Sequence, residues 1–192
     1  MLWRRVLRRQ MVEKRLALPR EMHAGLSAAI VAHLLRHLPQ LSNETVAFCW
    51  PVKNEPDVRA ALEEWRRQGA QAALPVVVAE GVPLAFRAWE ASTPLEPDRY
   101  GIPTPTRGAW LHPGALLLPL NAFDAQGYRL GYGGGYFDRT LAALSPRPLA
   151  IGVGFEMNRV ESIRPEAHDQ RLDWIVTEAG AFPVTADPPK PA

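Results

Sequence analysis

Apolar residues near the start of the chain recur at helical spacing. After Pro19, four of them occupy every fourth position: Met22, Leu26, Ile30 and Leu34. This spacing places them on one face of a helix, and proline is favoured in a first helical turn because its missing N–H needs no partner there. The composition of residues 2–18 also suits a helix. The sequence therefore predicts two opening helices.

Further along, short apolar runs alternate with helical segments. The runs predicted as strands are 46–50, 72–78, 84–89, 115–118, 149–153 and 174–177. Helices are predicted over residues 57–68, ended by Gly69, and after a glycine-rich segment, where Phe137, Leu141 and Leu144 share a face. A long loop rich in Pro, Gly and Thr is expected from Ser92 to Pro113. Such alternation predicts an α/β fold with a largely parallel open sheet and helices on both faces.

Composition narrows the class of protein. The chain has 192 residues, 47% of them hydrophobic, so we expect a single domain over residues 1–185. Its one cysteine has no partner for an intramolecular disulfide, so we expect a reducing, cytoplasmic setting. Residues 186–192 are expected to be a disordered, proline-rich tail. A net charge of +2 does not argue for nucleic-acid binding, and no apolar stretch is long enough to cross a membrane.

The segment richest in chemistry is residues 129–139, which read RLGYGGGYFDR and open into a helix. Glycines permit positive φ and leave backbone N–H groups free to converge on an anion, and the helix end adds positive potential. Arg129 and Arg139 can donate charge-assisted hydrogen bonds, whereas Asp138 would repel a bare phosphate unless it holds a Mg²⁺ ion. This favours a site for Mg-nucleotide. The alternative is a glycine-rich turn that only lets the chain pass close to a neighbour.

Several known motifs are absent. No Gly-Lys-Ser or Gly-Lys-Thr follows the glycines, and Tyr136 stands where Gly-x-Gly-x-x-Gly needs its last glycine. The sequence also lacks His-Glu-x-x-His and Gly-x-Ser-x-Gly. A standard dinucleotide fold, a zinc protease and a serine hydrolase therefore have no support.

Residues 119–139, PLNAFDAQGYRLGYGGGYFDR, closely resemble the signature of the 5-formyltetrahydrofolate cyclo-ligase family, also called methenyltetrahydrofolate synthetase. The resemblance extends to five further segments: 55–57, 100–103, 151–155, 168–169 and 173–178. It implies a three-layer α/β/α sandwich and an ATP- and Mg-dependent conversion of 5-formyltetrahydrofolate to 5,10-methenyltetrahydrofolate, with release of ADP and phosphate. The implied partners are these small molecules, and the protein is expected to be a monomer or weak dimer.

The resemblance also implies roles for individual residues. Arg129 and Asp138 are the expected catalytic residues, and Asp138 and Asp173 the expected Mg²⁺ ligands, with Asp169 as a second candidate. The expected ATP contacts are Arg4, Arg8, Arg129, Leu130, Gly131, Tyr132, Gly133, Gly134, Gly135, Tyr136 and Phe137. The expected folate contacts are Trp50, Glu55, Gly133, Gly134, Gly135 and Tyr136.

Each of these roles has a structural alternative. Arg4 and Arg8 stand four positions apart, in place of the family's Lys-x-x-x-Arg, and so share a helix face that can reach one polyphosphate. The other basic residues of this helix, Arg5, Arg9, Lys14 and Arg15, are expected on a solvated face.

The two acidic residues have structural alternatives too: Glu55 can instead stabilise the start of the following helix, and Asp173 can be a capping residue. His168 can be a structural histidine or a general base, and Cys49 is expected to fill the core.

Two competing functions remain at this point. One keeps the Mg-ATP site but phosphorylates a different small acid or amide. The other is a silent binding module that uses the basic first helix for RNA or another anionic partner, with steep salt dependence.

Overall fold

The computed structural model describes residues 2–185, so the expected tail, residues 186–192, lies outside the described residues. Four α-helices are present in this range: α1 (Leu2–Leu16), α2 (Arg20–His37), α3 (Arg59–Gln68) and α4 (Tyr136–Ala143). Two short 3-10 helices span Pro39–Asn43 and Glu156–Asn158. The helices lie within a few residues of the predicted positions. Pro19 caps α2, and Gly69 ends α3 with a φ of +126°.

A sheet of eight strands runs through the centre, in the order β12-β11-β10-β7-β1-β2-β3-β6. Its strands are β1 (Thr45–Phe48), β2 (Gln71–Val76), β3 (Ala85–Trp89), β6 (Trp110–Leu111), β7 (Ala115–Pro119), β10 (Leu149–Val153), β11 (Trp174–Thr177) and β12 (Gly180–Pro183). The neighbouring strands from β11 to β2 are parallel, whereas β12, β3 and β6 pair antiparallel at the two edges. The prediction of a largely parallel sheet is confirmed.

Two small hairpins lie outside this sheet: β4 (Leu95–Pro97) with β5 (Pro103–Pro105), and β8 (Ala122–Phe123) with β9 (Arg129–Leu130). The first hairpin and β6 fall inside the segment 92–113, which was predicted as one long loop and therefore contains three short strands that the prediction missed. Strands this short carry too few positions for a period of two to show in the sequence.

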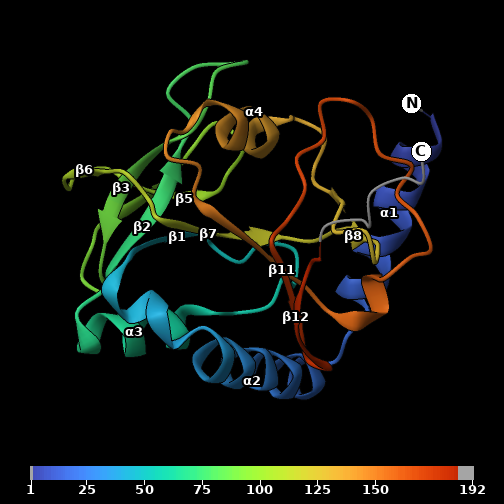
Figure 1. Ribbon diagram of the computed structural model, residues 1–192, viewed down its shortest axis with the longest axis horizontal. Helices are drawn as coiled ribbons and strands as arrows, with labels where there is room; N and C mark the ends of the chain where they lie inside the picture. The colour runs from blue at the N-terminus through green and yellow to red at the C-terminus, as the bar shows by residue number, and fades with distance from the viewer. Residues whose placement is uncertain (1, 186–192) are drawn as a thin grey trace.

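Helices cover both faces of the sheet, which confirms the three-layer arrangement (Figure 1). Alternate residues of β1 point to opposite sides: Val46 and Phe48 pack toward α2 and α3, and Ala47 packs toward α4. Strand β7 is buried on both faces, as its continuous apolar run predicts. Helix α1 lies at one end of the sheet, where Leu7 packs on the β8–β9 hairpin.

The glycines give a matched test of this packing. A Cβ added at buried Gly154 would lie 2.7 Å from the Cβ of Leu120, which cannot move by a rotamer change. We expect Gly154→Ala to lower the free energy of unfolding by about 1–3 kcal/mol, as overpacking does. Gly25 lies in α2 with nothing within 4 Å of its added Cβ, so Gly25→Ala should raise that free energy by up to about 1 kcal/mol. Denaturant unfolding of both variants checks the opposite signs.

Candidate active site

Most of the predicted site residues, though not Asp173, gather at the carboxyl ends of the parallel strands, where ligands collect in open α/β sheets. Strand β1 leads into the loop that carries Glu55, and β7 leads into the β8–β9 hairpin and the glycine segment. Helix α1 packs against this end of the sheet through the same hairpin (Figure 1). We call residues 131–135 the glycine loop.

Backbone conformation explains why glycines occupy this loop. Gly133 has a φ of +100°, and Gly135 has a φ of +65° in the residue position that caps α4. Both values lie in a region that residues with a Cβ rarely adopt. The loop therefore delivers its backbone directly to the amino end of α4, where unpaired N–H groups point outward and attract anions. Arg139, on α4, donates from Nη2 to the carbonyl oxygen of Gly134 at 2.6 Å.

Arg129 and Asp138 form an ion pair at the base of this loop. Nη1 of Arg129 lies 3.1 Å from Oδ1 of Asp138, which also accepts the backbone N–H of Gln170 at 3.0 Å. Arg129 is 5% exposed, and its Nε has no hydrogen-bond partner among the described residues. The two residues predicted to be catalytic are thus in contact, and Nε of Arg129 is a buried donor that remains available to a ligand.

The remaining predicted nucleotide contacts are not equivalent. The side chain of Leu130 is buried against α1, so Leu130 can offer only backbone groups to a ligand. The ring of Phe137 is half-buried against the core, and its centre lies 5.9 Å from the guanidinium of Arg129. Tyr136 lies at the start of α4, and its hydroxyl lies 2.9 Å from that of Tyr100, in the loop between β4 and β5. That loop therefore contacts the start of α4 directly.

Arg8 reaches the glycine loop, whereas Arg4 is bound elsewhere. Nε of Arg8 donates to the carbonyl oxygen of Gly131 at 2.6 Å, and its guanidinium lies against Gly133. Burial, with a smaller effect of Arg4, lowers the pKa of Arg8. Arg4 forms ion pairs with Asp169 at 2.8 Å and with Glu166 at 3.2 Å. Asp169, the second metal candidate, is therefore the partner of a cation in this structure.

Glu55 is 4% exposed and faces the glycine loop. Its Oε1 accepts the hydroxyl of Tyr132 at 2.5 Å, and its Oε2 accepts the backbone N–H of Val52 at 3.0 Å. Burial raises the pKa of Glu55, and the hydrogen bonds from Tyr132 and Val52 oppose that shift. The alternative role at the start of α3 belongs instead to Asp57, which accepts the backbone N–H of Arg59 at 3.1 Å.

Arg15 was expected on a solvated helix face, and this prediction was wrong. It is 1% exposed, and its guanidinium donates to Lys53, Asn121 and Tyr132. The sequence carried no signal for this, because Arg15 sits among other basic residues on α1 and only the tertiary fold separates it from them. Asn121, which accepts one of these hydrogen bonds, is itself fully buried.

Asp173 lies at the other end of its strand. It precedes β11, and its Oδ2 accepts Nη1 of Arg147 and the backbone N–H of Ala150, both at 2.7 Å. Among the described residues it shares no hydrogen-bond partner with Asp138. Asp173 stands at the amino end of β11, whereas Asp138 lies beside the glycine loop. Its role as a metal ligand stays a prediction.

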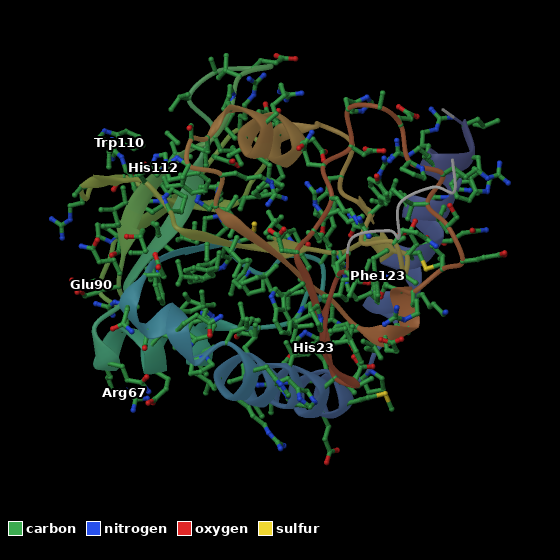
Figure 2. The ribbon with its side chains drawn as sticks, in the orientation of Figure 1. His23, Arg67, Glu90, Trp110, His112 and Phe123 are labelled. Atoms are coloured by element: carbon green, nitrogen blue, oxygen red, sulfur yellow. The ribbon has the colours of Figure 1, made fainter. Side chains whose placement is uncertain are left out.

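Trp50 lies beside a cavity of about 630 Å³ on the α2 and α3 side of the sheet. Trp89 and His23 also line this cavity, and Figure 2 shows His23 on α2. Arg59 stacks on the Trp50 ring at 4.7 Å from its centre. Neither Glu55 nor any residue of the glycine loop lines this cavity.

The direction of the Glu55 pKa gives a stability test. A carboxyl whose pKa is raised by folding favours the folded state in its protonated form, and that contribution is lost as the pH rises through the raised pKa. Glu55→Gln removes the titration, so the melting temperature of the variant relative to the natural protein should rise between about pH 4 and pH 8. Thermal melts of both proteins measure this. A difference that moves the other way would contradict the direction assigned to Glu55.

Acidic, histidine and cysteine side chains are the usual protein ligands of metal ions. Within residues 2–185, no group of three or more His, Cys, Asp or Glu side chains is placed to hold a metal ion. A single carboxylate with water and phosphate oxygens is a common Mg²⁺ environment, so the paired Asp138 fits such a role beside a bound polyphosphate. No helix among the same residues is long and apolar enough to span a bilayer.

Known proteins resemble this chain over nearly its whole length. A model of the 5-formyltetrahydrofolate cyclo-ligase family matches residues 1–178. The chain is 29% identical over 183 residues to the 5-formyltetrahydrofolate cyclo-ligase of Mycolicibacterium smegmatis, with 89% of this chain and 91% of that protein covered. It is 28% identical over 174 residues to the protein of the same name from Mycoplasma pneumoniae, covering 90% and 96%.

A solved structure agrees with these relatives. The NMR structure of Aquifex aeolicus 5,10-methenyltetrahydrofolate synthetase matches with a TM-score of 0.84 at 27% identity, covering 100% of this chain and 97% of that one. This similarity extends over nearly the whole sequence. It therefore includes the Arg129–Asp138 pair, the glycine loop and the buried Glu55 that faces the loop. The chain belongs to the 5-formyltetrahydrofolate cyclo-ligase family.

Proposed function

We propose that the protein converts 5-formyltetrahydrofolate to 5,10-methenyltetrahydrofolate with consumption of Mg-ATP. The observation that carries this proposal is the Tyr132–Glu55 hydrogen bond of 2.5 Å, which joins the anion-binding glycine loop to a buried carboxylate. A carboxylate can accept paired hydrogen bonds from the N–H edge of a pterin-like ring, while the loop amides and arginines suit phosphates. Family membership supports the same pair of substrates.

The chemistry explains why ATP is needed. The formyl group on N5 is an amide, so its carbon is a poor electrophile and its oxygen a poor leaving group. Attack of that oxygen on the γ-phosphorus forms a P–O bond and releases ADP. N10 then attacks the activated carbon and loses its proton, and the C–O bond to phosphate breaks as the ring closes. No protein nucleophile is required.

The protein's task in this scheme is positioning and charge stabilisation. We propose that Arg8, Arg129 and the glycine-loop amides hold the polyphosphate, with Arg129 placed by Asp138. Asp138 and Asp173 are the residues proposed to hold Mg²⁺, which would neutralise phosphate charge, and Asp138 has the stronger support because it adjoins the loop. Glu55 and Trp50 are proposed to orient the folate.

The first test is the absorbance of the methenyl product after mixing the pure protein with 5-formyltetrahydrofolate and Mg-ATP, with each component omitted in turn. A rise that needs all components would support the proposal. Nucleotide binding without a rise would direct attention to another acceptor.

The RNA-binding alternative loses support because Arg4, Arg8 and Arg15 of the basic helix all bind groups within the protein.

A further inference from the structure

The buried guanidinium of Arg15 joins three separate segments of the chain. Its Nε donates to the carbonyl oxygen of Lys53 at 2.9 Å, its Nη1 to Oδ1 of Asn121 at 3.0 Å, and its Nη2 to the hydroxyl of Tyr132 at 2.9 Å. Oε1 of Glu55 lies 3.7 Å from the same Nη2. Because the three donors lie on a rigid planar fork, these bonds fix the orientation of the group as well as its position.

Burying the Arg15–Glu55 ion pair costs desolvation free energy, so its presence calls for a role other than stabilising the fold. Removing a cation and a carboxylate from water costs several kcal/mol per ion in general, and an apolar pair of similar volume often packs as well. Arg15 and Glu55 are nevertheless 1% and 4% exposed. Exposed positions of the same helix, such as Arg9, show that basic residues are easily accommodated in water there.

We propose that Arg15 is a positioning residue for folate binding: its guanidinium holds Glu55 and Tyr132 in place without touching either substrate. This inference rests on the proposed function, because it takes Glu55 as the carboxylate that meets the folate. Tyr132 is the link, since its hydroxyl accepts from Arg15 and donates to Glu55. Asn54 fixes the same loop from the other direction by donating to the carbonyl oxygen of Arg15 at 2.9 Å.

The nucleotide side of the site has an independent support. Arg8 holds the glycine loop through the carbonyl oxygen of Gly131, and Arg129 holds the start of α4 through Asp138. Neither contact involves Arg15, whose hydrogen bond to the glycine loop goes to the side-chain hydroxyl of Tyr132 and not to the backbone amides proposed to hold phosphate. Loss of Arg15 should therefore weaken the binding of folate much more than the binding of ATP, a split that general loosening of the fold would not produce.

Steady-state kinetics of Arg15→Met test this split. We expect the KM for 5-formyltetrahydrofolate to rise at least about 10-fold and the KM for ATP to stay within about 3-fold of the natural protein. Arg9→Met is the matched control, because Arg9 lies on the same helix with its side chain 71% exposed. Unchanged folate KM, or equal rises in both constants, would overturn the proposal.

A pH profile gives a second readout. The groups around Glu55 are Arg15 from α1, Tyr132 from the glycine loop, Lys53, Cys49 and the Val52 N–H from its own loop, and His23 of α2 on its carbonyl oxygen. Arg15 opposes the effect of burial on the pKa of Glu55, so Arg15→Met should move the acidic limb of kcat/KM for folate to higher pH. Arg15→Lys keeps the charge and should leave that limb in place while the folate KM still rises. If the acidic limb of kcat/KM in Arg15→Met lies at the same pH as in the natural protein, the positioning role of Arg15 is contradicted.

Tyr132→Phe covers the case in which Arg15→Met fails to fold. It removes only the hydroxyl that links Arg15 to Glu55, and it should shift the acidic limb in the same direction. Folding is checked by circular dichroism. Absence of turnover in the natural protein would reject the proposed function itself, whereas an active natural protein with unaltered Arg15→Met and Tyr132→Phe variants would reject only the role of Arg15.

Discussion

Asp138→Asn is expected to lower kcat at least about 100-fold, which is the loss typical of removing one preorganised electrostatic contact in an active site. Asparagine has nearly the same shape but no negative charge. It therefore loses the ion pair with Nη1 of Arg129, which lies at 3.1 Å, and the carboxylate proposed as a Mg²⁺ ligand. Oδ1 of the amide can still accept the N–H of Gln170, so the fold should survive. Coupled measurement of ADP release at saturating substrates gives kcat, and a thermal melt confirms folding.

Asp173→Asn is the informative companion to this variant. Both carboxylates are proposed Mg²⁺ ligands, but Asp173 binds Arg147 and the start of β10 instead of the glycine loop. A magnesium titration of each variant separates the two roles: a ligand's loss raises the Mg²⁺ concentration needed for half-maximal rate. Normal turnover in folded Asp138→Asn would contradict its assignment, and an unchanged titration in Asp173→Asn would remove that residue from the metal site.

The main elements of the fold were predictable because their apolar patterns are strong. The continuous apolar run of β7 is buried. In α2, Ile30 and Leu34 of the four-residue repeat are fully buried, whereas Met22 at its start is exposed. Strand β12 and the β8–β9 hairpin were not predicted, since two to four residues show no clear period. Their positions depend on pairing with distant strands, which a local pattern does not contain.

The candidate site divides in a similar way. The glycine loop was predicted from residues whose chemistry stands out locally, whereas Glu55 was named from the family resemblance. The structure brings the two together through Tyr132. Arg15 was misjudged because a basic residue in a basic helix carries no local mark of burial. Asp173 was named from the family resemblance, which does not say at which end of a strand the residue stands. It precedes β11 and therefore stands at the amino end of that strand.

Arg129→Lys is expected to lower kcat by about 100-fold or more, since arginine contacts to a transferring phosphoryl group are among the largest single contributions in such reactions. Lysine keeps the positive charge but presents one compact ammonium in place of a planar fork. In the natural protein Nη1 donates to Asp138 at 3.1 Å and to the carbonyl oxygen of Gln170 at 3.4 Å. Within residues 2–185, Nε has no hydrogen-bond partner. An ammonium that keeps the pair with Asp138 has no second edge to offer to phosphate.

The control is Arg66→Lys, because Arg66 forms a surface ion pair with Glu90 at 3.2 Å on α3, away from the glycine loop. Its kcat should equal that of the natural protein. Combining Arg129→Lys with Asp138→Asn adds a stronger test, since two residues that act as one unit lose far less together than the sum of their separate losses. A kcat for Arg129→Lys within about 3-fold of the natural value would show that charge alone suffices, and that the fork geometry imposed by Asp138 has no part in phosphoryl transfer.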